Sequence, residues 1–425
     1  MARNEKEILH QDIEDIFNME TALFPVLVDM RFLGVRVNAE RAAIEKQRMV
    51  EEENRLLGGI FAETKLDVQI WAARSIAKVF DKLGLPYERT LKTGSPSFTK
   101  NFLSNHPHKL VQAIAKAREI NKAHTTFIDT ILKYSQRGRI HAEINQLRGD
   151  SGGTVTGRFS MNNPNLQQIP ARNKDLGPRI RSLFIPEEHC KWGCFDYNQQ
   201  EPRLVVHYAA LQGFYSVEDV VDAYKNENAD FHQIVADMAG IGRFQAKTIN
   251  LGLFYGMGKN KLQAELGTNK LQAEQLFKQY HSKVPFVKQL MDAVMSRAQQ
   301  RGKVRTLLGR LCRFHLWEPN QFGIHKPLPH DAALAEHGPG IRRAYTYKAL
   351  NRLIQGSAAD MTKKAMIDLH AEGIIPHLQV HDELDISVQN KEEAKKIKDI
   401  MESTVSLEVP NKVDYEEGDN WGSIK

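Results

Sequence analysis

Four residues of one short segment have the types and the spacing of a site for a nucleoside triphosphate. They recur at every fourth position: Arg243, Lys247, Leu251 and Tyr255. An α-helix turns once per roughly 3.6 residues, so in a helix all four lie along one face. Phosphates could pair with the two leading cations while a flat base lies over the apolar end. An ordinary amphipathic helix with basic residues in solvent gives the same pattern, so other segments must decide.

Two acidic segments far from this helix each accompany an apolar run typical of a buried strand. One run ends at Asp196, and a pair of short runs over 378–388 places Asp382 and Glu383 at its turn. Phosphoryl transfer with two divalent ions, roughly 3.5–4 Å apart, needs acidic oxygens to hold them. A lone aspartate at a strand end is more often a turn residue or helix cap. Two such sites beside a cationic helix favour the two-metal interpretation.

Five segments, in order along the chain, resemble the motifs of family A DNA polymerases, the group of bacterial DNA polymerase I and related phage replicases. They are 156–160 with 164–170, motif A at 196–203, the fingers helix at 243–256, Asn351 with 355–360, and motif C at 380–383. The similarity runs from about residue 20 to the C-terminus, where GDNWG also fits. It implies template-directed addition of deoxynucleotides to a primer 3′-hydroxyl, with release of pyrophosphate.

The resemblance implies an α+β right-hand polymerase fold with a thumb, a palm built on an antiparallel sheet, and largely helical fingers. The mostly helical residues 1–145 would be the thumb with a short N-terminal extension. Residues 146–212 would be the first part of the palm, 213–349 the fingers and 350–425 the second part of the palm. In the sequence, the fingers would be inserted between the two segments of the palm that carry the carboxylates. The fingers could then move while the metal ligands stay fixed.

The metal ligands follow from the resemblance. Asp196 and Asp382 would hold two Mg²⁺ ions, and the backbone carbonyl of Tyr197 would complete one shell. Oxygen ligands and substrate phosphates suit this hard cation, and Mn²⁺ could substitute for it. Glu383 is a second ligand or charged neighbour in one interpretation and a solvent-facing residue in the other, and the sequence leaves both open. Lys247 is the candidate for protonating the leaving pyrophosphate.

Further contacts to the nucleotide are implied in the same way. Glu201 matches the family's steric gate, a carboxylate against the sugar that excludes a 2′-hydroxyl. Tyr255 would stack near the templating position. His232 matches a histidine near the phosphates, although alone it would more often be structural. The nucleotide-binding candidates are Arg243, Lys247, Leu251, Tyr255, Glu201, Gln199, His232 and Arg172.

Primer and template would meet four residues near the growing end. These are Arg158, Asn351, Gln355 and His381. Arg158 and Gln355 carry donors for minor-groove acceptors, which all correct base pairs present alike. Elsewhere, basic residues spread along the helical pattern at 110–134 fit phosphate contacts of any sequence, although a solvated helix face explains each of them as well.

Several positions depart from the family pattern. Leu251 stands where many relatives have Phe or Tyr, which predicts altered handling of sugar analogues. Pro202 follows the gate residue and lacks a backbone N–H. Tyr347 stands four residues before Asn351, where bacterial relatives have Arg, and Lys348 points about 100° away from it on a helix. The Pro- and His-rich residues 314–340 have little family counterpart and are expected to be a long loop.

The bulk properties fit a globular chain with a polyanionic partner. A net charge of +6 and a pI of about 9.0 suit nucleic acid without requiring it. No run reaches the ~20 apolar residues that cross a bilayer, so no membrane partner is expected. Three cysteines indicate no disulfide framework and favour the cytoplasm, that of a bacterial host if the chain is phage-encoded. His189, Cys190 and Cys194 lack a fourth ligand, and a zinc site there is not favoured.

The resemblance leaves no room for the N-terminal 3′–5′ exonuclease domain common in this family, so the chain is expected not to proofread. Asp12 and Glu14 match that domain's Asp-x-Glu pattern only superficially. A separate exonuclease subunit, or a longer parent chain, is expected to supply the activity. Phage genome replication is favoured over DNA repair. A single-subunit RNA polymerase and an inactive DNA-binding clamp are the rival functions, opposed by Glu201 and by the intact acidic and cationic residues.

Overall fold

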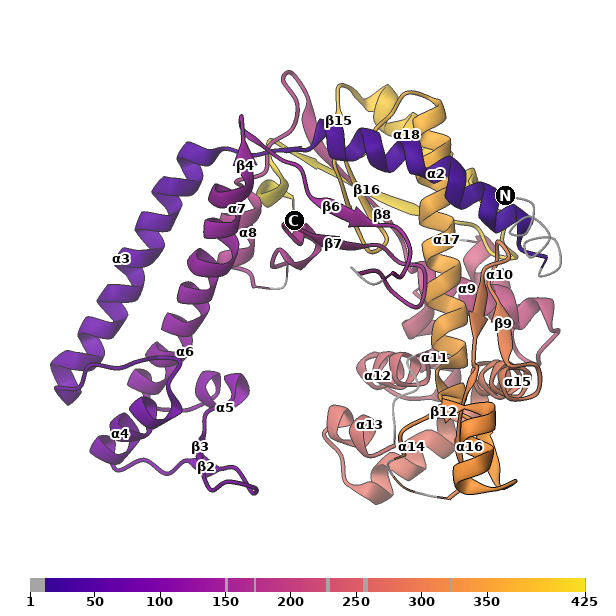
Figure 1. The fold of residues 1–425 in the computed structure, drawn as a ribbon, viewed down its shortest axis with the longest axis horizontal. Coiled ribbons are helices and arrows are strands. Elements are labelled where there is room, and N and C mark those ends of the chain that lie inside the picture. Colours follow the sequence, from indigo (N-terminus) through magenta and orange to yellow (C-terminus); the bar gives the residue numbers. More distant parts are fainter. Residues whose placement is uncertain are drawn as a thin grey trace. The chain divides into compact units, whose positions relative to one another are not determined.

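The computed structural model describes residues 12–149, 152–171, 173–226, 230–254, 259–321, 323 and 325–424. The chain divides into two compact units (Figure 1). Unit 1 contains Met1–Phe32, Ile144–Met161 and Cys194–Tyr415, and unit 2 contains Leu33–Glu143, Asn162–Gly193 and Glu416–Lys425. The fold mixes helices with small sheets, as an α+β chain should. The division into thumb, palm and fingers stays a prediction.

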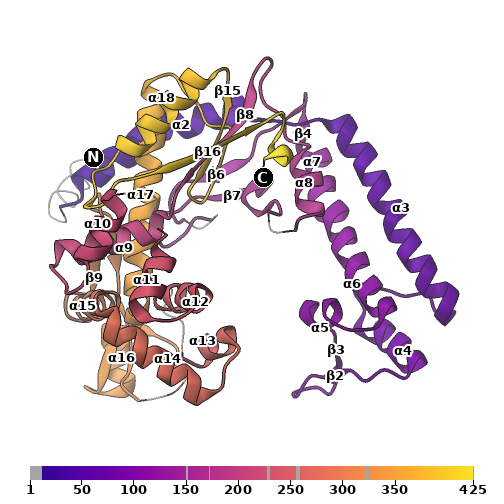
Figure 2. The ribbon, with the colours of Figure 1, turned by 180° about the vertical axis from the view of Figure 1, so that it is seen from behind.

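Unit 1 contains most of a four-stranded sheet of order β14-β15-β8-β16; the start of β8 and the end of β16 fall within the bounds of unit 2. Its strands are β8 (Lys191–Tyr197), β14 (Leu378–Val380), β15 (Glu383–Val388) and β16 (Val413–Gly418). Three helices share a hydrophobic core with them: α9 (Gln200–Leu211), α17 (Ala349–Ala371) and α18 (Lys391–Ser403). In Figures 1 and 2, α17 extends from α18 to α15 and β9. Burial of this shared apolar surface holds the strand ends in place.

The middle of unit 1 is helical. Its helices are α10 (Glu218–Asn226), α11 (Phe231–Ala239), α12 (Arg243–Phe254), α13 (Lys259–Leu266), α14 (Lys270–Lys283) and α15 (Pro285–Arg301). The side chain of Asp230 caps α11 by accepting from the amides of His232 and Gln233, at 2.9 and 3.2 Å. Gly240, with φ +63°, ends this helix in the left-handed region that glycine tolerates. Helix α12 begins soon afterwards and packs against α11.

Residues 303–348 form two small sheets, and the expectation of a long loop over 314–340 is wrong. The elements are β9 (Lys303–Arg305), β10 (Leu311–Arg313), β11 (Leu316–Pro319), β12 (Leu328–Pro329), α16 (His330–His337), β13 (Ile341–Arg343) and η3 (Thr346–Lys348). Strand β11 pairs with both β12 and β13. The ring of Trp317 lies 4.5 Å from the guanidinium of Arg343 and 4.8 Å from the ring of His330. These strands are too short, and their partners too distant in sequence, for a periodic pattern of hydrophobic residues to indicate them.

A buried ion network ties helix α2 (Glu14–Leu33) to α17 within unit 1. The Arg310 guanidinium pairs with Glu20 and, at 2.7 Å, with Asp360. Lys363 donates to Glu20 at 2.8 Å, and both Asp360 and Lys363 are fully buried. Burial lowers the pKa of Lys363 to about 8, against the raising effect of Glu20. Gly157, with φ +84°, is pressed against this network, because an added Cβ would lie 2.6 Å from Nε of Arg310.

Unit 2 is mainly helical and has its own core. Its helices are α3 (Ala39–Thr64), α4 (Ala73–Leu83), α5 (Lys100–Ser104), α6 (Lys109–Lys122), the π-helix η1 (Ala123–Ile128), α7 (Asp129–Tyr134) and α8 (Leu176–Arg181). Short strands form a sheet of order β1-β5-β4 and a pair β2-β3. Their bounds are β1 (Val35–Arg36), β2 (Glu88–Arg89), β3 (Pro96–Ser97), β4 (Ser135–Gln136) and β5 (Arg139–Ile140). His124 of η1 and Glu53 of α3 lie 2.6 Å apart and join the long helices α3 and α6. Among the helices that the structure describes, none is long and apolar enough to cross a membrane.

Candidate active site

Asp196 and Asp382 lie at the ends of neighbouring strands of the unit 1 sheet. Asp196 is near the end of β8, and Asp382 is in the two-residue turn between β14 and β15, where Val380 pairs with Glu383. His381 makes this tight turn possible with a left-handed φ of +61°. The backbone N–H of Tyr197 donates to the carbonyl of Asp382 at 3.2 Å, which sets the two strand ends against each other. The structure therefore brings together the two aspartates that the sequence singled out.

The electrostatics of this strand end favour bound cations. Burial, followed by the charges of Asp382, Glu383 and Asp414, raises the pKa of Asp196 to about 8. Burial also raises the pKa of Asp382. Several carboxylates in a partly desolvated site cannot easily all be ionised unless a cation binds among them. Their hard oxygen donors fit divalent ions such as Mg²⁺.

Asp414 is a member of this cluster that sequence reasoning missed. It lies on β16, next to β8, and accepts a hydrogen bond from Asn198 Nδ2 at 2.7 Å. Asn198 also donates its backbone N–H to the carbonyl of Lys412 at 2.8 Å. The acidic strand DYEEG near the C-terminus was the available signal. Nothing in one sequence showed that this strand pairs beside motif A.

Glu383 and Cys194 lie deeper in the same sheet. The Cys194 thiol is 2.8 Å from Oδ1 of Asp385 and 3.8 Å from Oε1 of Glu383. Among the described residues, these three form the group whose ligand atoms could meet on one metal ion. Glu383 is half-buried, and its charge adds to the field at Asp196. Its role as a second ligand or as a charged neighbour of the aspartates stays a prediction. None of the three cysteines, all of which the structure describes, forms a disulfide bond.

Helix α12 carries the predicted cationic stripe on its exposed face. Arg243 and Lys247 are exposed and Leu251 is half-buried, while the opposite face packs into the core. Nε of Arg243 donates to Asp230 at 2.7 Å. Burial alone would raise the pKa of Asp230, but the Arg243 hydrogen bond and the helix amides hold it below its usual value. Asp230 thus joins the site as the partner of Arg243, which the sequence did not reveal.

His232 lies beside these cations as a neutral imidazole. Burial lowers its pKa to about 4, and the nearby charges of Lys247 and Arg243 act in the same direction. Nδ1 of His232 lies 3.1 Å from Nδ2 of Asn250. The amide can donate to that nitrogen, which leaves Nε2–H as the ring's donor. The Tyr280 hydroxyl in turn donates to the Asn250 carbonyl, so the ring orientation is fixed from behind.

The predicted gate residue is held by an ion pair. Glu201, in the first turn of α9, accepts from Nη2 of Arg158 at 2.6 Å. The charge of Arg158 opposes the rise in the pKa of Asp382, and that of Glu201 adds to it, so both lie within electrostatic reach of the catalytic candidates. Pro202 also lies in this first turn, where no N–H has an intrahelical partner. Its missing donor is therefore tolerated.

Gln199 joins the end of β8 to the start of α11. Its φ of +53° is left-handed. Its side-chain oxygen accepts from the N–H of Phe231 at 2.8 Å and from the hydroxyl of Tyr224 at 3.2 Å. The side chain thus braces the helix that carries His232. Tyr255 and Arg172, both predicted to bind the nucleotide, lie outside the described residues.

Comparison with known proteins identifies the family of this chain. Residues 40–423 match the model of DNA polymerase family A. The DNA-directed DNA polymerase of Pseudomonas phage M6 is 34% identical over 99% of this chain and 68% of its own length. The chain belongs to DNA polymerase family A. This confirms the resemblance and the expected enzyme class, a DNA-directed DNA polymerase.

The polymerase is also similar to a bacterial enzyme and to a solved structure. DNA polymerase I of Geobacillus stearothermophilus is 32% identical, and the chain spans about half of that relative's length, 47%. The solved POL domain of Pol1 from M. smegmatis, in a complex with DNA primer-template and dNTP, matches with a TM-score of 0.79. It is 25% identical and covers 99% of this chain and 73% of its own. The predicted right-hand polymerase fold is confirmed by this match.

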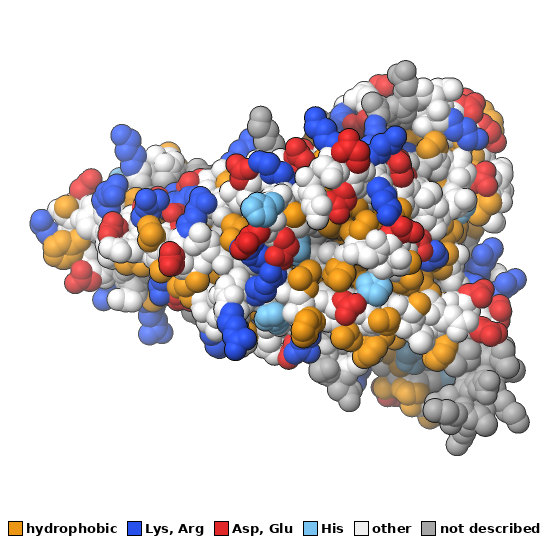
Figure 3. Space-filling model, turned by 90° about the horizontal axis from the view of Figure 1, so that it is seen from above, with side chains coloured by type: hydrophobic (Ala, Val, Ile, Leu, Met, Phe, Trp, Pro, Cys, Tyr) orange, Lys and Arg blue, Asp and Glu red, His pale blue; other side chains and the backbone are white. Residues whose placement is uncertain are grey.

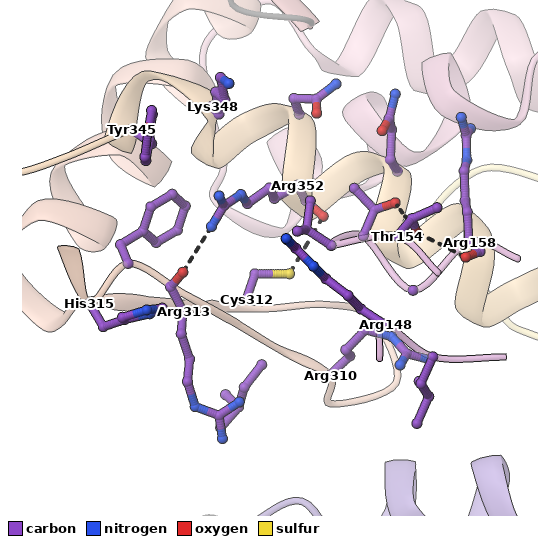
Figure 4. A pocket seen from close by; sticks show the side chains of 18 of the residues that line it. Arg148, Thr154, Arg158, Arg310, Cys312, Arg313, His315, Tyr345, Lys348 and Arg352 are labelled. Atoms are coloured by element: carbon purple, nitrogen blue, oxygen red, sulfur yellow. Dashed lines mark hydrogen bonds between the residues drawn. The ribbon is translucent and has the colours of Figure 1, made fainter. Parts of the chain in front are cut away.

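Three of the four predicted primer-template residues of the polymerase line one cleft of about 1460 Å³ in unit 1 (Figure 4). Arg158 comes from the loop before β7 (Ser160–Asn162), and Asn351 and Gln355 lie one turn apart on α17. The fourth, His381, is at the turn beside Asp382. Tyr347 is 51% exposed and does not line the cleft, whereas Lys348 does. The cation nearest to this position in the cleft lining is therefore Lys348, and whether it contacts the template stays a prediction.

Proposed function

We propose that this family A polymerase adds dNTPs to a primer 3′-hydroxyl by a two-metal-ion reaction at Asp196 and Asp382. The observation that carries the proposal is the hydrogen bond from Tyr197 N–H to the Asp382 carbonyl, together with the raised pKa of Asp196. Bound divalent ions would activate the attacking hydroxyl and take up charge on the leaving phosphates. The backbone carbonyl of Tyr197 is proposed as a third metal ligand.

The cations of α12 are proposed to bind the triphosphate. Arg243 is held by Asp230 until a more highly charged anion competes for it. Lys247 is exposed one turn further along and is proposed to protonate the leaving pyrophosphate. A neutral His232 can donate Nε2–H to a phosphate oxygen without adding a charge. Gln199 is proposed to act through α11, because its side chain is bonded to the start of that helix.

Removing the Glu201 carboxylate is expected to admit ribonucleotides. In Glu201→Ala, the kcat/KM for an rNTP relative to its dNTP should rise at least about tenfold, which corresponds to about 1.4 kcal/mol of lost steric exclusion. Single-nucleotide incorporation on a DNA template measures the ratio. Glu201→Gln is the matched control, because it keeps the bulk and loses the charge that binds Arg158. An unchanged ratio in the alanine variant would remove Glu201 from the gate.

Residue 251 is proposed to set the response to sugar analogues. Leu251 has no ring to stack near the sugar, so the polymerase is expected to discriminate against dideoxynucleotides. Leu251→Tyr should increase dideoxynucleotide incorporation relative to deoxynucleotide by about tenfold, the effect of about 1.4 kcal/mol. Leu251→Met controls for side-chain volume without a ring. Chain-termination patterns that are the same in all three proteins would contradict the assignment.

Phage genome replication is the proposed biological role, because relatives from Pseudomonas phage M6 and Acinetobacter phage SH-Ab 15497 are named as phage DNA polymerases and match over 99% and 98% of this chain. Similarity to bacterial DNA polymerase I keeps repair as the alternative. A location in the bacterial cytoplasm, the absence of proofreading and a separate exonuclease subunit stay predictions.

Primer extension with Mg²⁺ tests the proposed function directly. The chain should extend a DNA primer with dNTPs and should discriminate strongly against NTPs. Preference for NTPs would favour the RNA polymerase, and binding without extension would favour the inactive clamp. A primer with a mismatched 3′ end reports exonuclease activity in the same assay, since its shortening would contradict the absence of proofreading.

A further inference from the structure

Helix α2 carries an apolar face that the proposed reaction does not use. Its exposed members are Phe17, Phe24, Val28 and Phe32, which are 49%, 63%, 48% and 86% exposed. At about 100° per residue they fall within an arc of about 80°, along roughly 22 Å of helix. Figure 3 views the molecule from the side on which α2 lies in Figure 1 and shows hydrophobic side chains gathered on that face. Three of the five exposed phenylalanines among the described residues are on this one helix, so they are not the singly scattered apolar residues of an ordinary surface.

The opposite face of α2 holds the helix in place. Leu23 and Val26 are fully buried in the core of unit 1. The two charged side chains in the middle of the helix are engaged with α17, since Glu20 pairs with the buried ion network and Asp29 lies 2.7 Å from Nε2 of His370. The exposed face is therefore a fixed platform, and its apolar side chains cannot turn inwards to be covered.

The charges on this exposed face are at its two ends and have opposite signs. Glu14 precedes the apolar residues and Arg31 lies beside the last of them, and both are exposed. From Phe17 to Val28, every exposed residue of the helix is uncharged. A partner would therefore need an apolar middle, a basic group for Glu14 and an acidic group for Arg31. A second copy of α2, turned antiparallel, supplies all three and also aligns the two helix dipoles favourably.

We propose that this chain forms a two-fold dimer in which the exposed face of α2 packs antiparallel against the same face of a second copy. Pairing Phe17 of one copy with Phe32 of the other places the two-fold axis beside Phe24, so the two Phe24 rings meet there. Each Arg31 then lies within about one turn of Glu14 of the other copy. One helix pair is a small interface, so association in the micromolar range is expected. The inference does not depend on the proposed reaction.

Sedimentation equilibrium of the full chain, from about 1 to 100 µM, tests the proposal. The average mass of the wild type should rise with concentration from the 48.4 kDa of one chain towards twice that value. DNA is left out, because Phe17 also lines the cleft of the primer-template candidates. Phe24→Glu places two like charges at the axis and should weaken association at least about tenfold. Phe61→Glu is the matched control, since it changes a phenylalanine of α3 that is 45% exposed and lies in unit 2, and it should associate like the wild type.

A charge reversal separates specific pairing from general stickiness. Arg31→Glu leaves acidic groups at both ends of the face and should weaken association about threefold or more at low salt, because each change counts twice in a two-fold dimer. Glu14→Arg combined with Arg31→Glu reverses both ends and should restore the wild-type affinity. An apolar surface that binds without regard to orientation would not recover in this way.

Cysteine cross-linking reports the antiparallel arrangement. Phe24→Cys should form a disulfide with itself under mild oxidation, because the residue lies beside the axis. Phe17→Cys should not, since its two copies would be roughly 22 Å apart along the helices, far beyond the reach of a disulfide. The wild type, treated in the same way, controls for the three native cysteines.

Four outcomes would overturn the inference. A wild type that stays monomeric over the whole range would leave this face to a different partner or to a longer parent chain. Equal losses in Phe24→Glu and Phe61→Glu would place the interface elsewhere. No recovery in the reversed pair, or cross-linking of Phe17→Cys as readily as of Phe24→Cys, would exclude the antiparallel dimer. Primer extension by Phe24→Glu should match that of the dilute wild type, which shows that the variant is folded and keeps this test apart from that of the proposed function.

Discussion

Asp382→Asn should reduce primer extension by at least about 10³-fold, which corresponds to ~4 kcal/mol of lost transition-state stabilisation. The substitution keeps the shape of the turn between β14 and β15 but removes one of the two carboxylates that are proposed to hold the metal ions. The proposed reaction would depend on that charge, because Asp196 and Asp382 would hold the ions that offset charge on the attacking and the leaving oxygen. Single-turnover extension at saturating DNA and Mg²⁺ measures the chemical step.

Asp414→Asn provides the matched comparison on the neighbouring strand. Asp414 adds to the field at Asp196 and is bonded to Asn198, but it is not proposed as a ligand. Its loss should slow extension by no more than about tenfold, and primer-template affinity should stay unchanged in both variants. An Asp382→Asn enzyme within tenfold of the wild type would remove Asp382 from the metal site. A larger loss in Asp414→Asn than in Asp382→Asn would move the site towards β16.

Arg310→Met should destabilise unit 1 by about 3–5 kcal/mol, the usual cost of breaking a buried ion pair from one side. The substitution keeps an apolar stem of similar length but leaves Asp360, which is fully buried, and Glu20 without the guanidinium that neutralises them. It also removes the group that packs against Gly157. Urea unfolding, with hydrogen exchange of the α17 amides as a local readout, measures the loss.

The control for this variant is an exposed ion pair. Lys288 pairs with Asp292 one turn along α15, and both side chains are 46% exposed. Such pairs contribute up to about 1 kcal/mol, so Lys288→Met should leave the protection of α17 unchanged. If Arg310→Met costs no more than this control, the network is not a source of stability. Reduced activity with unchanged stability would instead point to the Gly157 contact, which orients the turn that precedes Arg158.

The sequence was informative where local pattern and family motif coincide. The strand before Asp196, the turn at Asp382 and the face of α12 all follow from spacing within a few residues, and the structure has them in those places. Asp414 and Asp230 could not be found in this way, because their relation to the site depends on strand and helix neighbours distant in sequence.

Other features were hidden for similar reasons. The pairing of Glu20 with Arg310 and Lys363 joins three distant segments, and each residue alone looks like a surface charge. The strands of residues 316–343 are two to four residues long, which is too short for alternation to indicate them. The contact between Trp317 and Arg343 could not be predicted from their spacing in the sequence. The two side chains meet only when β13 folds back against β11.

The bond from Tyr197 N–H to the carbonyl of Asp382 has a consequence for how such a chain can vary. Separation of the two acids is governed by adjacent positions in a sheet and not by the length of polypeptide between them. Additional modules such as β11 to β13 with α16 can therefore be acquired, trimmed or exchanged in the intervening stretch while the reaction centre keeps its dimensions. The segments that handle the substrate can therefore change while the residues proposed for the chemistry stay the same.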